Sequence, residues 1–182
     1  MDNNKGNIKF VWRVTAAHTI AYFCAGIFAV LFMDYKNYFS SGAMSSFMLP
    51  TDTPIVALGP ALQTIRGIIM GLVLLPIRKA FTDEKYGFLK LWLLIIGLSV
   101  FSTFAAAMGS IDGFIYTKVS AIEQVLGYPE AFLWVTLLAG ILWAFYKFEK
   151  KVINIVALVL VILIIFMGIM GYLQGIGAIN VQ

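Results

Sequence analysis

The sequence predicts an all-α, polytopic membrane protein, a bundle of five transmembrane helices with a cap on its outer face. Of the 182 residues, 61% are hydrophobic and only 12% are charged, about half of the roughly 25% charged residues in a typical soluble domain. The mean hydropathy is +0.91. Five apolar runs approach the roughly 20 residues that a helix needs to cross a bilayer. We therefore expect residues 1–182 to form a single transmembrane domain whose surface faces mostly lipid.

The apolar runs and the longer connections between them define the expected elements. The predicted helices cover residues 10–33, 60–80, 89–108, 129–146 and 152–173. The first run is too long, and too polar near its start, to be a cleaved signal peptide, so we expect it to be retained. We expect Pro60 to open the second helix, since a proline at the first helical position loses no hydrogen bond. The alternative is a start near Pro54, which would place Arg66 close to the midplane of the membrane. Segments 34–59 and 109–128 should cap the outer face, and Trp134 and Trp143 should lie in an aromatic belt.

The distribution of basic residues predicts the orientation. Ten of the thirteen Lys and Arg residues flank helix ends that fall on one side of the membrane. They are Lys5, Lys9, Arg13, Arg78, Lys79, Lys85, Lys90, Lys147, Lys150 and Lys151. Because such residues accumulate on the cytoplasmic side, we expect a cytoplasmic N-terminus and an external C-terminus, in a plasma membrane or bacterial inner membrane. The net charge of +4 is then a topology signal, which argues against a nucleic-acid partner.

Arg66 is a charged residue inside an apolar run. It lies six residues after Pro60, about 9 Å below the outer end of a helix that begins there. Gln63 precedes it by one helical turn, so the two side chains should share a face. Charges within a membrane are costly and usually face the interior of a bundle or a wet cavity.

Arg66 has three open interpretations. In the first, Asp112 or Glu130, at the outer ends of the third and fourth helices, pairs with it and clamps the outer half of the bundle. In the second, Arg66 and Gln63 line an outward-facing pocket for an anionic group, such as a carboxylate, a phosphate or a lipid headgroup. In the third, Arg66 snorkels towards the outer surface.

His18 lies on a semi-polar face of the first helix, together with Tyr22 one turn later. It could relay protons, since the unperturbed pKa of histidine is about 6.5. The alternative, which we favour, is a hydrogen bond across the bundle to Tyr22, a threonine or a backbone carbonyl. As the single histidine of the chain, it rules out bis-histidine haem ligation within one protomer.

Two pairs of glycines have the spacing of helix-packing positions. Gly67 and Gly71 are four residues apart in the second helix, and Gly171 and Gly175 are four apart in the fifth. Small residues at this spacing let a partner helix approach closely. We expect these glycines to pack within the chain, against another copy of it, or against a larger membrane complex.

Signatures of catalysis and of cofactor binding are missing from the sequence. There is no H-E-x-x-H, G-x-S-x-G, Walker A or G-x-G-x-x-G motif, and the single Cys24 permits no disulfide within the chain. Asp112, Glu123 and Glu130 could hold a divalent cation, but solvated surface charges explain the same residues. We therefore expect no metal and no cofactor, and an enzymatic function is disfavoured.

These features favour a small multi-pass protein that binds or transports an anionic solute or a lipid headgroup. Its pocket would surround Gln63 and Arg66, and Asp112 or Glu130 would hold the arginine in the empty state. The alternative is a non-catalytic accessory subunit of a membrane complex or homo-oligomer. A lipid-modifying enzyme is a third hypothesis. In each case membrane lipids are the expected surroundings.

Overall fold

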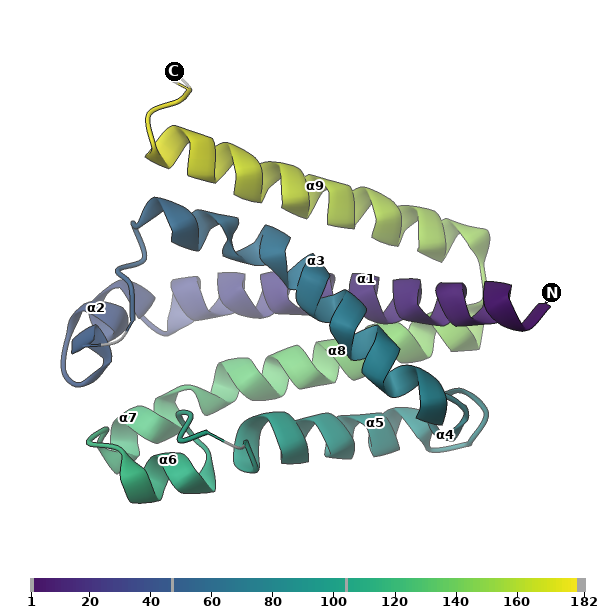
Figure 1. Cartoon of the computed structure of the whole chain (residues 1–182), viewed down its shortest axis with the longest axis horizontal. Coiled ribbons are helices and arrows are strands. Elements are labelled where there is room, and N and C mark those ends of the chain that lie inside the picture. Colours follow the sequence, from purple (N-terminus) through teal and green to yellow (C-terminus); the bar gives the residue numbers. More distant parts are fainter. Residues whose placement is uncertain (1, 47, 104, 180–182) are drawn as a thin grey trace.

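The computed structural model describes residues 2–46, 48–103 and 105–179, and that part of the chain is helical with no β-strand (Figure 1). Within it, four helices are long and apolar enough to cross a membrane. They are α1 (Asp2–Phe32), α3 (Pro54–Leu74), α8 (Tyr128–Phe148) and α9 (Lys151–Gly175). These helices identify a multi-pass membrane protein.

Helix α1 lies at the centre of the bundle. It contacts α3, α8 and α9, while α3 also packs on α9, and α5 (Gly87–Ile96) packs on α8 (Figure 1). The start of α1, the end of α3, the short α4 (Lys79–Thr82) and the junction of α8 with α9 lie together at one end of the molecule. We call this the basic end, because Lys79, Lys147 and Lys151 gather there. The opposite end, with α2, α6 and α7, is the cap end.

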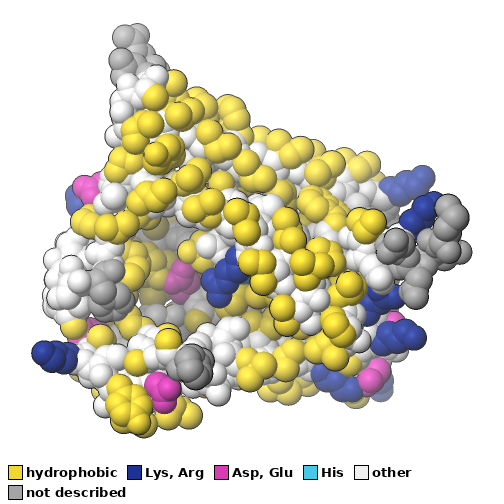
Figure 2. Space-filling model, in the orientation of Figure 1, with side chains coloured by type: hydrophobic (Ala, Val, Ile, Leu, Met, Phe, Trp, Pro, Cys, Tyr) yellow, Lys and Arg dark blue, Asp and Glu magenta, His cyan; other side chains and the backbone are white. Residues whose placement is uncertain are grey.

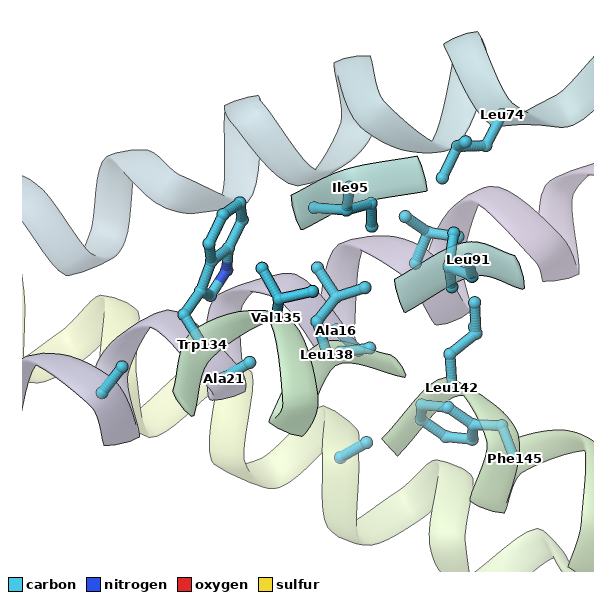
Figure 3. Close-up of a cluster of buried hydrophobic side chains, with 14 of the residues drawn as sticks. Ala16, Ala21, Leu74, Leu91, Ile95, Trp134, Val135, Leu138, Leu142 and Phe145 are labelled. Carbon is cyan, nitrogen blue, oxygen red and sulfur yellow. The ribbon is translucent and has the colours of Figure 1, made fainter. Parts of the chain in front are cut away.

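Small residues on α1 allow the central packing. Ala17 and Ala21 are fully buried, and Figure 3 shows Ala21 beside Trp134 and Val135 of α8. Helices in lipid associate through close van der Waals contact, which small side chains permit. The outward faces of α3 and α9 instead expose aliphatic side chains over a broad surface (Figure 2), as expected of surfaces that meet lipid.

The second spanning helix begins earlier than predicted, at Pro54 rather than Pro60. Pro54 takes the position near the helix start that suits proline, and Pro60 lies inside the helix, where membrane helices tolerate it. The apolar helix ends at Leu74 and a 3-10 turn, Leu75–Ile77, follows it. Arg66 is therefore twelve residues from the start, about 18 Å along the axis. It lies near the middle of the helix rather than near its outer end.

The third predicted helix, 89–108, is shorter in the structure. The ten residues of α5 run into a five-residue π turn, Gly97–Phe101, and the helix ends there. Ser102 has a non-helical backbone, and the Thr103 hydroxyl donates a hydrogen bond to the carbonyl of Ala105; such local bonds compete with helix formation. The structure thus gives four helices of spanning length in the described residues and one shorter apolar helix, in place of the five predicted.

The two predicted outer segments contain short helices that contact each other. Segment 34–59 forms α2 (Tyr35–Ser40) and a 3-10 turn, Met44–Ser46, before α3 begins; segment 109–128 forms α6 (Ile111–Tyr116) and α7 (Ala121–Leu126). The Tyr38 hydroxyl donates to the backbone carbonyl of Glu123 over 2.8 Å. Burial and the nearby Glu123 carboxylate raise the pKa of Tyr38 above its ordinary value, which keeps this donor protonated.

Gln124 holds the second outer segment together, and its replacement by leucine should loosen that segment. Its buried side chain accepts a hydrogen bond from the Gly109 N–H over 3.0 Å and donates to the Gly113 carbonyl over 2.6 Å and to Thr117 Oγ1 over 3.2 Å. Because each bond contributes about 1 kcal/mol, we expect Gln124→Leu to speed proteolysis of this segment about tenfold or more. Limited proteolysis in detergent measures this, with the exposed Gln174→Leu as control. Equal cleavage rates in the two variants would contradict the prediction.

Candidate binding site within the spanning helices

Polar, charged and aromatic side chains from three spanning helices meet between the middle of the bundle and the cap end. Helices α1, α3 and α8 contribute one pair each, spaced three or four residues apart, so that each pair shares a helix face. We call this group the polar cluster: His18 and Tyr22, Gln63 and Arg66, Glu130 and Trp134. The structure therefore brings together five of the six residues predicted from sequence for the polar site and adds Trp134.

His18 joins the three helices through both ring nitrogens. Trp134 Nε1 donates to His18 Nδ1 over 3.2 Å, and His18 Nε2 lies 3.1 Å from Gln63 Oε1. Since the indole N–H can only donate, Nδ1 must accept and Nε2 must carry the hydrogen. This arrangement fixes a neutral tautomer of a fully buried ring. His18 therefore forms hydrogen bonds across the bundle, but with Gln63 and Trp134 instead of the predicted Tyr22, threonine or backbone carbonyl, and both ring nitrogens are engaged.

Arg66 projects from the face of α3 that bears Gln63. Its guanidinium carbon lies 5.3 Å from the centroid of the Trp134 ring, which is cation–π geometry. In the described part of the chain no carboxylate lies within 4.0 Å of it, so neither Asp112 nor Glu130 completes the predicted clamp. Glu130 and Arg66 are nonetheless both close enough to Tyr22 to act on it electrostatically.

Several polar groups of the cluster have no hydrogen-bond partner among the described residues. They are the Gln63 amide nitrogen, the Tyr22 hydroxyl and the Glu130 carboxylate. Figure 2 shows a hollow in this face of the molecule, between α3 and the cap end, with an acidic and a basic side chain next to each other inside it. The cluster thus offers hydrogen-bond donors around a positive charge, with one carboxylate nearby.

The remaining acidic candidates lie apart from the cluster. Asp112 is in the first turn of α6 and Glu123 caps the start of α7 by bonding to Ser120. Over the described residues, no three His, Cys, Asp or Glu side chains form a group that could hold a metal ion. The cation site considered for Asp112, Glu123 and Glu130 is therefore not assembled in this structure.

Arg13 is a second charge within the bundle, buried more deeply than the sequence predicts. The side chain is 1% exposed, and its guanidinium carbon lies 4.5 Å from the Tyr146 ring centroid and 5.5 Å from that of Phe145. Its Nε and Nη2 atoms have no hydrogen-bond partner in the described structure. Sequence placed Arg13 with the cytoplasmic basic residues, because α1 was expected to begin at residue 10. Since α1 begins at Asp2, Arg13 lies about 17 Å into the helix.

Trp134 also lies in a different environment from the one that the sequence predicts. It was expected in an aromatic belt, but it is 8% exposed and belongs to the core. Trp134 lies one helical turn after Glu130, and this spacing is the sequence feature that places the two side chains on the same face of α8. Trp143 is 45% exposed, as expected of a belt residue.

The four glycines predicted to pack helices lie at two close crossings. A Cβ atom on Gly67 would be 2.9 Å from Thr15 Cα, and one on Gly71 would be 3.0 Å from Val11 Cα, so both face α1. A Cβ on Gly171 or Gly175 would meet Ala57 or Pro54 of α3 at 3.1 Å and 2.9 Å. Both glycine pairs therefore pack within the chain, and the first pair fixes the distance between Arg66 and α1.

No protein-family model matches this chain, and no curated protein or solved structure is detectably similar to it.

Proposed function

We propose that this multi-pass membrane protein binds or transports a small anionic solute, and that Arg66 binds the anion. The observation that carries the proposal is an arginine in the middle of a spanning helix that has no carboxylate partner among the described residues. It lies next to donors on Gln63 and Tyr22 that bond to none of those residues. A charge in this position is costly and usually faces a wet cavity. A carboxylate or phosphate could accept a bidentate pair of hydrogen bonds from the guanidinium.

The other members of the cluster have distinct roles in this proposal. His18 and Trp134 orient the site, because their hydrogen bonds fix Gln63 and place the indole face under Arg66. Gln63 and Tyr22 add neutral donors, and Glu130 supplies the acceptor for a hydroxyl or ammonium group on the same solute. A lipid headgroup would present the same anionic chemistry.

The proposal includes an orientation and a fifth crossing. We place the basic end in the cytoplasm, so that the N-terminus is inside and the cap end faces the outside. The α5 helix and its π turn would cross as a fifth, shorter segment, completed by the irregular residues that follow. The membrane would be a plasma membrane or a bacterial inner membrane.

The alternative role, a subunit of a homo-oligomer or larger membrane complex, has less support. It relied on glycine-rich helix faces that would pack against a partner. Those faces are occupied within the chain, Gly67 and Gly71 by α1, Gly171 and Gly175 by α3.

Arg66→Gln tests the proposed anion site. We expect native mass spectrometry of the protein in mild detergent to detect an anionic solute bound to the parent and absent from a folded Arg66→Gln variant. We also expect one of four anions (acetate, succinate, inorganic phosphate or glycerol phosphate) to raise the unfolding temperature of the parent. The apparent affinity for that anion should be about tenfold or more lower in the variant. Lys118→Gln, which removes an exposed charge near the cap end, should behave as the parent does.

Two results would refute the anion site. One is a parent protein that holds no solute and responds to none of the four anions, while Arg66→Gln unfolds or aggregates; Arg66 would then be structural. The other is an equal loss of response in Arg66→Gln and Lys118→Gln, which would indicate diffuse electrostatic attraction.

A further inference from the structure

A cavity of about 170 Å³ lies at the basic end, between the turn that joins α4 to α5 and the last turns of α8. Its walls include Thr82, Lys85, Trp143, Tyr146 and Lys147. The volume is smaller than the roughly 300–1,000 Å³ of pockets that hold drug-sized ligands. It is suited to a compact polar group rather than to an extended molecule.

The charges around this cavity favour an anion. Lys85 and Lys147 come from separate elements and line the same space. Both are exposed, and the Lys85 ammonium lies 5.3 Å from the centroid of the Tyr86 ring, so neither charge is neutralised by a carboxylate within 4.0 Å among the described residues. Glu84 also lines the cavity, but it forms an ion pair with Lys90. The net charge of the residues that line the cavity is therefore positive.

Arg13, which is buried in the core next to the cavity, adds to this positive charge. The Tyr146 ring that lines the cavity also stacks on the Arg13 guanidinium, 4.5 Å from its centroid. Two nitrogens of this buried group have no partner among the described residues, and none of the carboxylates described forms an ion pair with it. In surroundings of low dielectric constant a buried charge acts over a longer distance than an exposed one.

Aromatic side chains indicate that the cavity lies at the level of the lipid headgroups. Phe88 and Trp143 line it, with ring centroids 6.3 Å apart, and Phe148 lies 5.8 Å from Trp143. All three are exposed on the outside of the bundle. Exposed aromatic residues at the end of a spanning helix are typical of the membrane–water interface.

We infer that this cavity binds the phosphate headgroup of an anionic phospholipid from the leaflet at the basic end. Lys85 and Lys147 bind the phosphate oxygens through charge-assisted hydrogen bonds, and the acyl chains lie along the apolar faces of α5 and α8. Basic pockets between helices on the cytoplasmic side of membrane proteins favour this ligand class. A soluble phosphate offers the same oxygens without the chains. The site is independent of the polar cluster around Arg66.

The test is a native mass spectrometry titration of the full chain, in neutral detergent, with phosphatidylglycerol, phosphatidylcholine and inorganic phosphate. We expect phosphatidylglycerol to bind, and the double variant Lys85→Gln/Lys147→Gln to weaken its binding about tenfold or more. The matched control Lys150→Gln/Lys151→Gln removes two charges from the same end outside the cavity. At about 150 mM salt, where exposed charges are screened, it should change the affinity less than about threefold.

Three results would overturn the inference. Equal weakening by the two double variants would mean diffuse attraction to the basic end, and equal binding of phosphatidylcholine would exclude recognition of the anionic headgroup. Binding of inorganic phosphate as tight as that of the lipid would assign the cavity to a soluble ligand. Arg66→Gln should leave the lipid affinity unchanged, so that failure of this site and failure of the anion site are distinguishable.

Discussion

Gly67→Leu is expected to prevent α1 and α3 from packing as they do in this structure. Even the first side-chain atom would lie 2.9 Å from Thr15 Cα and 3.1 Å from the Thr15 carbonyl oxygen. Both are backbone atoms, so the clash can be relieved only by moving one helix away from the other. We expect a loss of about 3 kcal/mol or more in the free energy of unfolding, at the upper end of overpacking effects. Gly67→Ala should lose less, because alanine favours the helix by about 0.5–1 kcal/mol relative to glycine.

A control in the same helix separates this steric effect from helix propensity. A Cβ atom on Gly59 would have no neighbour within 4 Å, so Gly59→Ala should be neutral or slightly stabilising. Thermal unfolding in mild detergent, followed by circular dichroism, compares the variants. If Gly67→Leu and Gly59→Leu unfold at the same temperature, the α1–α3 crossing is not as close as the structure has it.

The same crossing illustrates what the sequence could predict. Gly67 and Gly71 were expected to face a helix because their spacing places them on one side of α3, and both face α1. Hydropathy likewise located the four spanning helices, since length and composition alone determine whether a helix can cross a bilayer. For the run 89–108 it predicted a longer helix than the structure has, because the apolar composition continues but Ser102 leaves the helical conformation.

The hydrogen-bond partners within the polar cluster could not be predicted from the sequence. Its residue pairs were expected to share helix faces, but the rotation of α1 relative to α8 depends on packing along their whole length. That rotation decides that the Trp134 N–H reaches His18 Nδ1. The start of α3 shows the same limit, because Pro54 and Pro60 are both acceptable first-turn residues and local preference does not choose between them. The six-residue difference moves Arg66 by about 9 Å.

Trp134→Ala should destabilise the protein strongly and also disturb the polar cluster. The ring is 8% exposed and packs with the α1 core, and truncating a buried tryptophan costs about 3–5 kcal/mol. The change also removes the N–H donor of His18 Nδ1 and the aromatic face beside Arg66. We therefore expect a large fall in the unfolding temperature, measured in mild detergent.

Two further variants divide this effect into packing and polar contributions. Trp143→Ala truncates the same residue type in the same helix at a 45% exposed position, and we expect it to cost well under half as much because little packing is lost. Trp134→Phe keeps an aromatic ring but leaves the buried Nδ1 of His18 without a donor, a loss of about 1–3 kcal/mol. If Trp134→Phe is as stable as the parent, the Trp134–His18 hydrogen bond does not hold the site. The orientation of Gln63 beside Arg66 would then depend on α3 alone, and Trp134→Phe should bind the anion as tightly as the parent does.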